Sequence, residues 1–120
     1  MKYKARRLKR CTYVADRPGH FPIVYRQYDG AGRLLYIGST TAKPQAQTPY
    51  THAYEIVDHE TRQRCRVVIA RIRTHKPTAS WFDQIRLVTI ERATDLASAR
   101  KAEWEAIGRE KPIYNKDRPN

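Results

Sequence analysis

Residues 23–38 have the sequence IVYRQYDGAGRLLYIG, in which two apolar runs flank the turn-forming stretch DGAG at residues 29–32. This pattern predicts a β-hairpin over about residues 22–38. If the connecting loop has an even number of residues, Tyr25 lies directly opposite Tyr36, and both side chains project to one face of the sheet. An odd loop or a bulge would break this pairing. The hairpin thus brings two phenol hydroxyls together, although an ordinary cross-strand aromatic pair has the same sequence pattern.

The chain combines the length of a single domain with a strongly basic composition. Its 120 residues include 24 Lys or Arg and 12 Asp or Glu, which gives a formal net charge of +12. This length allows one domain with a modest core. Excess positive charge indicates a polyanionic partner, most often nucleic acid, whereas the alternative is a generically basic, solvated surface.

The sequence gives no sign of a membrane span or of a metal site built on cysteine. No apolar run approaches the length needed to cross a bilayer, and no hydrophobic segment follows the basic N-terminus. Cys11 and Cys65 lack the spacing of zinc ligands. Free thiols and a cytoplasmic location, nucleoid-associated in a bacterial or phage protein, are therefore expected.

The chain divides into a basic N-terminal arm at residues 1–20, a folded domain at 21–116 and a tail at 117–120. Basic residues fill six of the first ten positions, namely Lys2, Lys4, Arg6, Arg7, Lys9 and Arg10. Blocks of this kind commonly contact phosphate groups. Within the domain, residues 39–57 have the composition of a long loop, and an insertion of this length is often functional.

Three further elements are predicted after this insertion. Asp58 is placed to cap a helix that runs to about Lys76 and stops before Pro77. Residues 83–91 alternate polar and apolar side chains as in a strand, and Thr94 precedes a helix over about residues 95–110. The order β-β-α-β-α predicts an α/β (α+β) fold, with a small three-stranded mixed or antiparallel sheet flanked by helices.

Glu103 is the residue that conflicts most clearly with its predicted surroundings. In the last helix it lies within an apolar stripe that includes Leu96 and Ile107. Burying an unpaired carboxylate costs several kcal/mol, so Glu103 requires a cation, hydrogen-bond donors or an opening to solvent. From this helix alone, a buried salt bridge and a functional carboxylate are equally good interpretations.

On the preceding predicted helix, Arg71 and His75 are four residues apart at the margin of an apolar stripe formed by Cys65, Val68 and Ile72. Residues at such a margin can face a cleft beside the helix. The more common alternative is that they are ordinary polar residues flanking a buried stripe. Arginines on the outward side suit phosphate contacts, and they are Arg62, Arg66 and Arg73. Tyrosines, an arginine with a histidine, and a carboxylate are groups of the kind that phosphodiester cleavage uses.

The motifs that contain these residues resemble those of the GIY-YIG nuclease superfamily. Residues 24–25 (VY) match the Ile-Tyr of the first motif, with Ile23 in place of its glycine, and residues 36–38 (YIG) match the second motif in full. Residues 71–75 (RIRTH), followed by Trp81, are similar to the arginine helix of the family. The individual tripeptides are weak signals, but their order and spacing together are fairly specific.

The closing signature of the family is similar to this chain at Glu103, at Ile107 and at residues 112–115 (PIYN), so the resemblance covers about residues 22–115. It implies a metal-dependent DNA endonuclease. By resemblance, Tyr25 and Tyr36 orient or activate the attacking water, and Glu103 binds one divalent ion, Mg²⁺ or Mn²⁺. The resemblance also implies roles for four other residues: Arg71 at the scissile phosphate, His75 at the phosphate or leaving group, and Asn115 and Gly38 in support of the site.

Some alternatives stay open at this point. The segment between Gly38 and Arg71 is longer than the family shows, so the arginine could instead be Arg62, Arg64 or Arg66. The DNA would be double-stranded or branched, and a partner protein could supply targeting. A non-catalytic nucleic-acid-binding module would keep the fold and the charge without cleaving. A small RNA- or ribosome-associated protein would share only charge and size.

Overall fold

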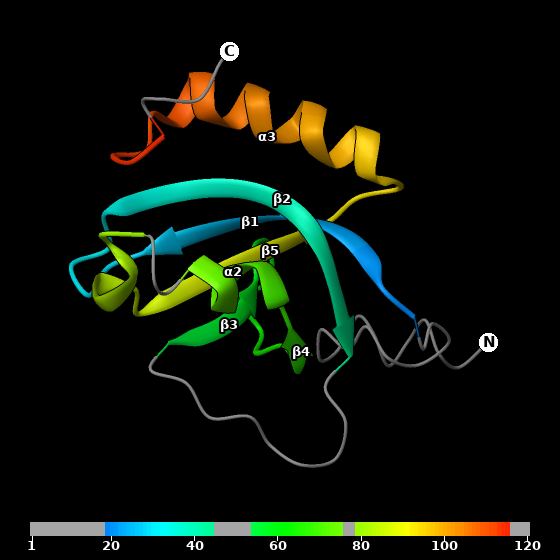
Figure 1. The fold of residues 1–120 in the computed structure, drawn as a ribbon, viewed down its shortest axis with the longest axis horizontal. Helices are drawn as coiled ribbons and strands as arrows, with labels where there is room; N and C mark the ends of the chain where they lie inside the picture. Colours follow the sequence, from blue (N-terminus) through cyan, green and yellow to red (C-terminus); the bar gives the residue numbers. More distant parts are fainter. Residues whose placement is uncertain (1–18, 45–53, 76–78, 116–120) are drawn as a thin grey trace.

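The computed structural model describes residues 19–44, 54–75 and 79–115, with side chains described for all of these except residues 73–75. The described residues form a five-stranded sheet with strand order β3-β5-β1-β2-β4, and α3 lies along one face while α2 lies on the other (Figure 1). In chain order the elements are β1 (Phe21–Tyr28), β2 (Leu34–Pro44), β3 (Glu55–Asp58), β4 (Val67–Val68), α2 (Ala70–His75), the 3-10 turn η1 (Phe82–Gln84), β5 (Leu87–Arg92) and α3 (Leu96–Glu110).

The mixed α+β class is confirmed, but the prediction of three strands is wrong. The β-β-α-β-α order is present as β1, β2, α2, β5 and α3. Two short strands are added to it, because β3 pairs in parallel with β5 and β4 pairs antiparallel with the end of β2. Among the described residues, no helix has the length and apolar character needed to cross a membrane.

The predicted hairpin is confirmed as the antiparallel pair β1–β2, but its register differs from the prediction. Tyr25 pairs with Gly38, Gln27 pairs with Tyr36, and the register shifts between Gln27 and Tyr28. The loop at residues 30–32 is odd, because the amide of Asp29 donates to the carbonyl of Arg33 at 3.1 Å. Either the odd loop or the shift alone would place the two tyrosines on opposite faces. Together they cancel, so Tyr25 and Tyr36 share a face without being directly opposed.

Asp29 and Gly32 shape this odd loop. The Asp29 Oδ1 accepts hydrogen bonds from the amides of Ala31 at 3.0 Å and Arg33 at 2.8 Å. These bonds, the Arg33 amide first, hold the pKa of Asp29 below its ordinary value. Gly32 adopts φ of 85°, the left-handed conformation that glycine reaches without steric cost. A turn followed by a left-handed glycine is a common three-residue hairpin loop.

The region between β2 and α2 departs most from the sequence prediction. β2 continues to Pro44 and β3 begins at Glu55, so the predicted loop at residues 39–57 is partly sheet, and residues 45–53 lie outside the described part. Asp58 caps a turn rather than a helix, since its Oδ2 accepts from the amides of Glu60 at 3.1 Å and Thr61 at 2.8 Å. Turns and helix starts present similar free amides, so an aspartate suits both. The helix itself begins only at Ala70.

The C-terminal elements follow the prediction with shifted boundaries. β5 begins at Leu87, later than predicted, because residues 82–84 form η1. The helix α3 is capped by Asp95 rather than Thr94, since the Asp95 side chain accepts from the amide of Ser98 at 2.7 Å. This hydrogen bond lowers the pKa of Asp95. Both residue types are good caps, and the residue with the extended backbone of an N-cap, directly before the first helical residue, is Asp95.

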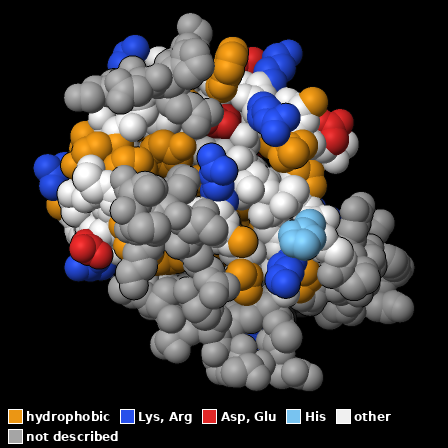
Figure 2. All heavy atoms as spheres, viewed as in Figure 1, with side chains coloured by type: hydrophobic (Ala, Val, Ile, Leu, Met, Phe, Trp, Pro, Cys, Tyr) orange, Lys and Arg blue, Asp and Glu red, His pale blue; other side chains and the backbone are white. Residues whose placement is uncertain are grey.

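Each face of the sheet carries its own hydrophobic cluster. On the α3 face, Val24 and Ile37 pack with Ala99, Ala106 and Ile107. The other face is larger and carries Tyr25 and Tyr36 among fifteen buried residues. Cys65 is buried there and is disulfide-bonded, so the expectation of a free thiol is wrong for this residue. Lys and Arg side chains are spread over the face seen in Figure 2 rather than gathered in one patch.

A buried ion pair fixes the C-terminal end of α3 to the sheet. Arg26 on β1 is 3 % exposed, and its Nε and Nη2 donate to the two carboxylate oxygens of Glu110 at 2.9 and 2.8 Å. Its Nη1 donates to Glu91 on β5. Burial alone would lower the pKa of Arg26, but the bonds to Glu110 and Glu91 raise it overall. The bond from Arg26 in turn lowers the pKa of Glu110.

Replacing Glu110 with Gln tests this ion pair. Because the folded-state pKa of Glu110 is lowered, its stabilising effect is present above the unfolded pKa and is lost as the pH falls through the folded pKa. We expect Glu110→Gln to lower the free energy of unfolding at neutral pH by about 1–2 kcal/mol, with the difference from wild type shrinking toward pH ~3. Urea denaturation across this pH range measures it. Glu105→Gln, an exposed position on the same helix, is the control, and a pH-independent difference for Glu110→Gln would contradict the account.

Candidate active site

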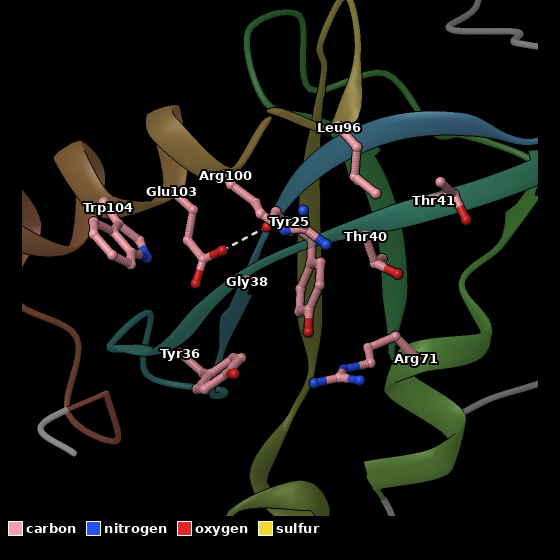
Figure 3. Close-up of a pocket in the computed structure, with 11 residues that line it drawn as sticks. Tyr25, Tyr36, Gly38, Thr40, Thr41, Arg71, Leu96, Arg100, Glu103 and Trp104 are labelled. Carbon is pink, nitrogen blue, oxygen red and sulfur yellow. Dashed lines mark hydrogen bonds between the residues drawn. The ribbon is translucent and has the colours of Figure 1, made fainter. Parts of the chain in front are cut away.

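A cavity of about 410 Å³ opens along β2, with residues of β1, α2 and α3 also lining it. Five of the residues predicted from the motifs lie in this cavity: Tyr25, Tyr36, Gly38, Arg71 and Glu103 (Figure 3). The remaining lining residues are Ser39, Thr40, Thr41, Leu96, Arg100 and Trp104. Residues from four separate elements therefore meet at one place.

The cavity lies along the edge of β2 that faces away from β1, at residues that no described strand pairs with on that side. At one end β2 pairs with β4 at Lys43 and Pro44. At the other end residues 113–115 lie beside it, since the amides of Ile113 and Tyr114 donate to the carbonyls of Leu34 and Leu35 at 3.2 and 2.8 Å. Residues 38–41 lie between these two covered segments and line the cavity. Within the described part of the chain, this edge of β2 is therefore uncovered where the candidate residues converge.

Gly38 explains how Tyr25 reaches this edge. Tyr25 is on β1, an inner strand, and is 1 % exposed. A Cβ atom on Gly38 would lie 2.5 Å from both the Cζ and the hydroxyl oxygen of Tyr25, closer than real contacts allow. The tyrosine ring therefore occupies the space that a side chain on its cross-strand partner would fill. Its hydroxyl consequently passes over β2 to the cavity.

An aromatic stack holds Tyr36. The Tyr36 and Trp81 rings are stacked with centroids 5.0 Å apart, and Trp81 stacks in turn on Tyr114 at 4.9 Å. The Trp81 indole nitrogen donates to the side-chain oxygen of the buried Gln27 at 2.7 Å. The Tyr25 and Tyr36 centroids are 6.2 Å apart at an interplanar angle of 35°. Packing on this scale fixes the Tyr36 ring on the face that carries Tyr25.

Glu103 is buried and accepts a hydrogen bond from the edge strand. Its side chain is 1 % exposed, and the Ser39 hydroxyl donates to its Oε1 at 2.5 Å. A buried carboxylate requires such donors. Figure 3 shows the carboxylate pointing from α3 toward β2 at the cavity. The apolar stripe expected around Glu103 is present, since Ala99, Ala106 and Ile107 are buried on the same helix.

Two arginines lie at the cavity, one on each helix. Arg71, near the start of α2, is exposed, and in Figure 3 its guanidinium points toward the hydroxyls of Tyr25 and Tyr36. Arg100 is on α3, three residues before Glu103. The alternatives Arg62, Arg64 and Arg66 are exposed but do not line the cavity, and Arg64 pairs with Glu55. The geometry therefore favours Arg71 among the candidates for a phosphate-binding arginine.

The sequence prediction missed Arg100 and Trp104. Both flank Glu103 on α3, so helical spacing could have indicated Arg100 once Glu103 was singled out.

Several other predicted site residues have side chains outside the described part of the chain. His75 ends α2 and Arg73 precedes it, but both side chains lie outside the described residues, as do Lys2, Lys4, Arg6, Arg7, Lys9 and Arg10. The exposed Arg62 and Arg66 lie between β3 and α2 rather than on a helix.

Asn115 holds β2 at the residue between Tyr36 and Gly38. Its Oδ1 accepts from the amide of Ile37 at 2.8 Å, and its Nδ2 donates to the carbonyl of Ile37 at 3.0 Å. The side-chain amide thus satisfies both backbone groups of Ile37, as a neighbouring strand would. Asn115 is 2 % exposed and does not line the cavity, so it acts on the site through β2.

The donor set suits a divalent ion that binds together with a phosphate. Within the described residues, no group of three or more His, Cys, Asp or Glu side chains is placed to hold a metal. Mg²⁺ commonly uses only one or two carboxylates and completes its shell with water and substrate phosphate oxygens. The buried Glu103 carboxylate, with one oxygen bonded to Ser39, fits that requirement.

Comparisons of the chain with protein-family models, curated proteins and solved structures found no match.

Gly38→Ala tests the close approach of Tyr25. The added methyl group would overlap the tyrosine ring, so we expect a loss of about 1–3 kcal/mol in the free energy of unfolding. Gly30→Ala is the matched control, because its Cβ would meet only Arg86 Cγ at 3.7 Å, and it should change stability by less than about 0.5 kcal/mol. Urea denaturation compares them. Equal stabilities would show that the ring does not depend on Gly38.

Asn115→Ala tests the support of β2. It leaves the buried amide and carbonyl of Ile37 without their partner, at a cost of about 1–3 kcal/mol for each group. Hydrogen exchange at the Ile37 amide should accelerate strongly, and urea denaturation should show the lower stability. Exchange at the Ile37 amide as slow as in wild type would contradict this role.

Proposed function

We propose that the protein is a metal-dependent endonuclease that hydrolyses phosphodiester bonds in DNA, with a GIY-YIG-like domain at residues 21–116. One observation carries the proposal. Tyr25, Tyr36, Arg71 and Glu103, which the motifs single out from three separate parts of the sequence, line one cavity. Tyrosines, an arginine and a buried carboxylate in one cavity provide hydrogen bonds for a nucleophile, positive charge for a phosphate and an anionic ligand for a cation.

The tyrosines suit the attacking water. Their rings lie side by side on one face, fixed by Gly38 and by the Trp81 stack. Two phenol oxygens beside the phosphate can hold a water molecule in line with the bond to be broken. A phenol is a weak base at neutral pH, so the tyrosines orient the water more effectively than they deprotonate it.

The arginines suit the phosphate. Arg71 and Arg100 approach the cavity from α2 and α3. Guanidinium groups bind phosphate oxygens in a bidentate way and stabilise the negative charge that grows in the transition state. The net charge of +12 supplies further, sequence-independent attraction to DNA, which weakens as salt increases.

Glu103 is the residue that would hold the divalent ion, with Ser39 keeping the carboxylate in place. A bound Mg²⁺ or Mn²⁺ would neutralise phosphate charge and help the leaving oxygen depart.

A plasmid-nicking assay tests the proposal. Supercoiled plasmid is incubated with wild type, Glu103→Ala and Tyr36→Phe in Mg²⁺, in Mn²⁺ and in EDTA. We expect nicking by wild type with metal, none in EDTA, and a decrease of at least about 100-fold in both variants. Glu105→Ala, exposed on the same helix, is the control and should nick like wild type.

Absence of nicking by wild type with either metal would refute the proposal, as would full activity of Glu103→Ala. In that case, salt-dependent DNA binding without cleavage would identify a non-catalytic nucleic-acid-binding module. Binding to RNA in preference to DNA at matched salt would instead indicate an RNA- or ribosome-associated protein.

A further inference from the structure

Trp104 is an exposed aromatic side chain at the edge of the cavity. Its side chain is 49 % exposed, and among the described residues only Ile113 is a comparably exposed large hydrophobic residue. Trp104 follows Glu103 directly in sequence and lines the same cavity. Exposure of an indole is unfavourable in water, and about half of the Trp104 side chain is accessible to another planar group.

The face of α3 around Trp104 is basic and uncrowded. Arg100, Trp104 and Gly108 are four residues apart, so they lie along one line of the helix. A Cβ atom on Gly108 would meet nothing within 4 Å, so the surface next to the indole is open. Arg100 supplies positive charge at the same cavity, and a basic groove beside an accessible aromatic ring is the arrangement with which proteins stack bases of unpaired nucleic acid.

We propose that Trp104 stacks on an unpaired nucleobase of the DNA strand whose phosphate occupies the cavity. This inference rests on the proposed function, since it takes the ligand of the cavity to be a DNA phosphate. In a duplex the faces of a base are covered by its neighbours, so only an unpaired nucleotide offers a face to the indole. The preferred substrate is therefore DNA with an unpaired nucleotide next to the scissile phosphate.

Binding measured without metal tests this subsite separately from cleavage. Fluorescence anisotropy in EDTA compares a labelled duplex with the same duplex carrying a short central stretch of unpaired nucleotides. We expect wild type to bind the DNA with unpaired nucleotides about tenfold more tightly. Trp104→Ala should bind both DNAs with the weaker affinity, and Trp104→Phe should retain most of the preference because it keeps an aromatic ring.

Two variants serve as controls. Arg100→Ala should weaken binding to both DNAs by the same factor and reduce the salt dependence by about one ion, because it removes a phosphate contact. Ile113→Ala removes the other exposed hydrophobic side chain and should leave the preference unchanged. Equal binding of the two DNAs by wild type, or a preference that persists in Trp104→Ala, overturns the inference.

The outcome is distinguishable from that of the nicking assay. If wild type does not cleave but its preference for unpaired DNA is lost in Trp104→Ala, the base-stacking subsite stands and the endonuclease proposal fails. If wild type cleaves and Trp104→Ala binds both DNAs like wild type, the endonuclease stands and the subsite fails.

Discussion

The candidate site depends on one packing constraint, the ring of Tyr25 lying across Gly38. Tyr25 is on an inner strand, where a side chain would normally remain beneath its neighbours, and only the absence of a Cβ on Gly38 lets its hydroxyl reach the edge of β2. The same edge receives Glu103 through Ser39 and is held by Asn115. A displacement of β2 at Gly38 would therefore move the tyrosine, the carboxylate ligand and their support together.

The sequence predicted the existence of the hairpin and the shared face of the tyrosines, but not the register. Two residues on paired strands share a face when the register places them an even number of residues apart. The odd loop after Asp29 and the register shift beside Gln27 each move the pairing by one residue, so together they leave Tyr25 and Tyr36 on the same face. Glu103 was predictable for a different reason. A carboxylate within an apolar stripe conflicts with burial, so its position indicated a special environment before the fold was known.

The failures of prediction also have physical causes. Asp58 suited a helix start and a turn equally, and the six-residue α2 is too short to show a helical period of its own. The strands β3 and β4 are short, so their pairing with β5 and β2 depends on contacts distant in sequence. Arg100 and Trp104 were missed because exposed basic and aromatic residues on a helix look like an ordinary solvated face until the cavity beside them is known.

The two helices that form the site are held in unequal ways. α3 is capped by Asp95 at its start and fixed by the Arg26–Glu110 ion pair at its end, so Glu103 lies on a helix attached at both ends. α2 has six residues and no capacity to form alone, so the fully buried Ile72 must hold it against the sheet. Arg71 precedes that anchor directly. The position of Glu103 is thus fixed by the attachment of α3 at both ends. The position of Arg71, the proposed phosphate-binding arginine, depends instead on the packing of Ile72 beside it.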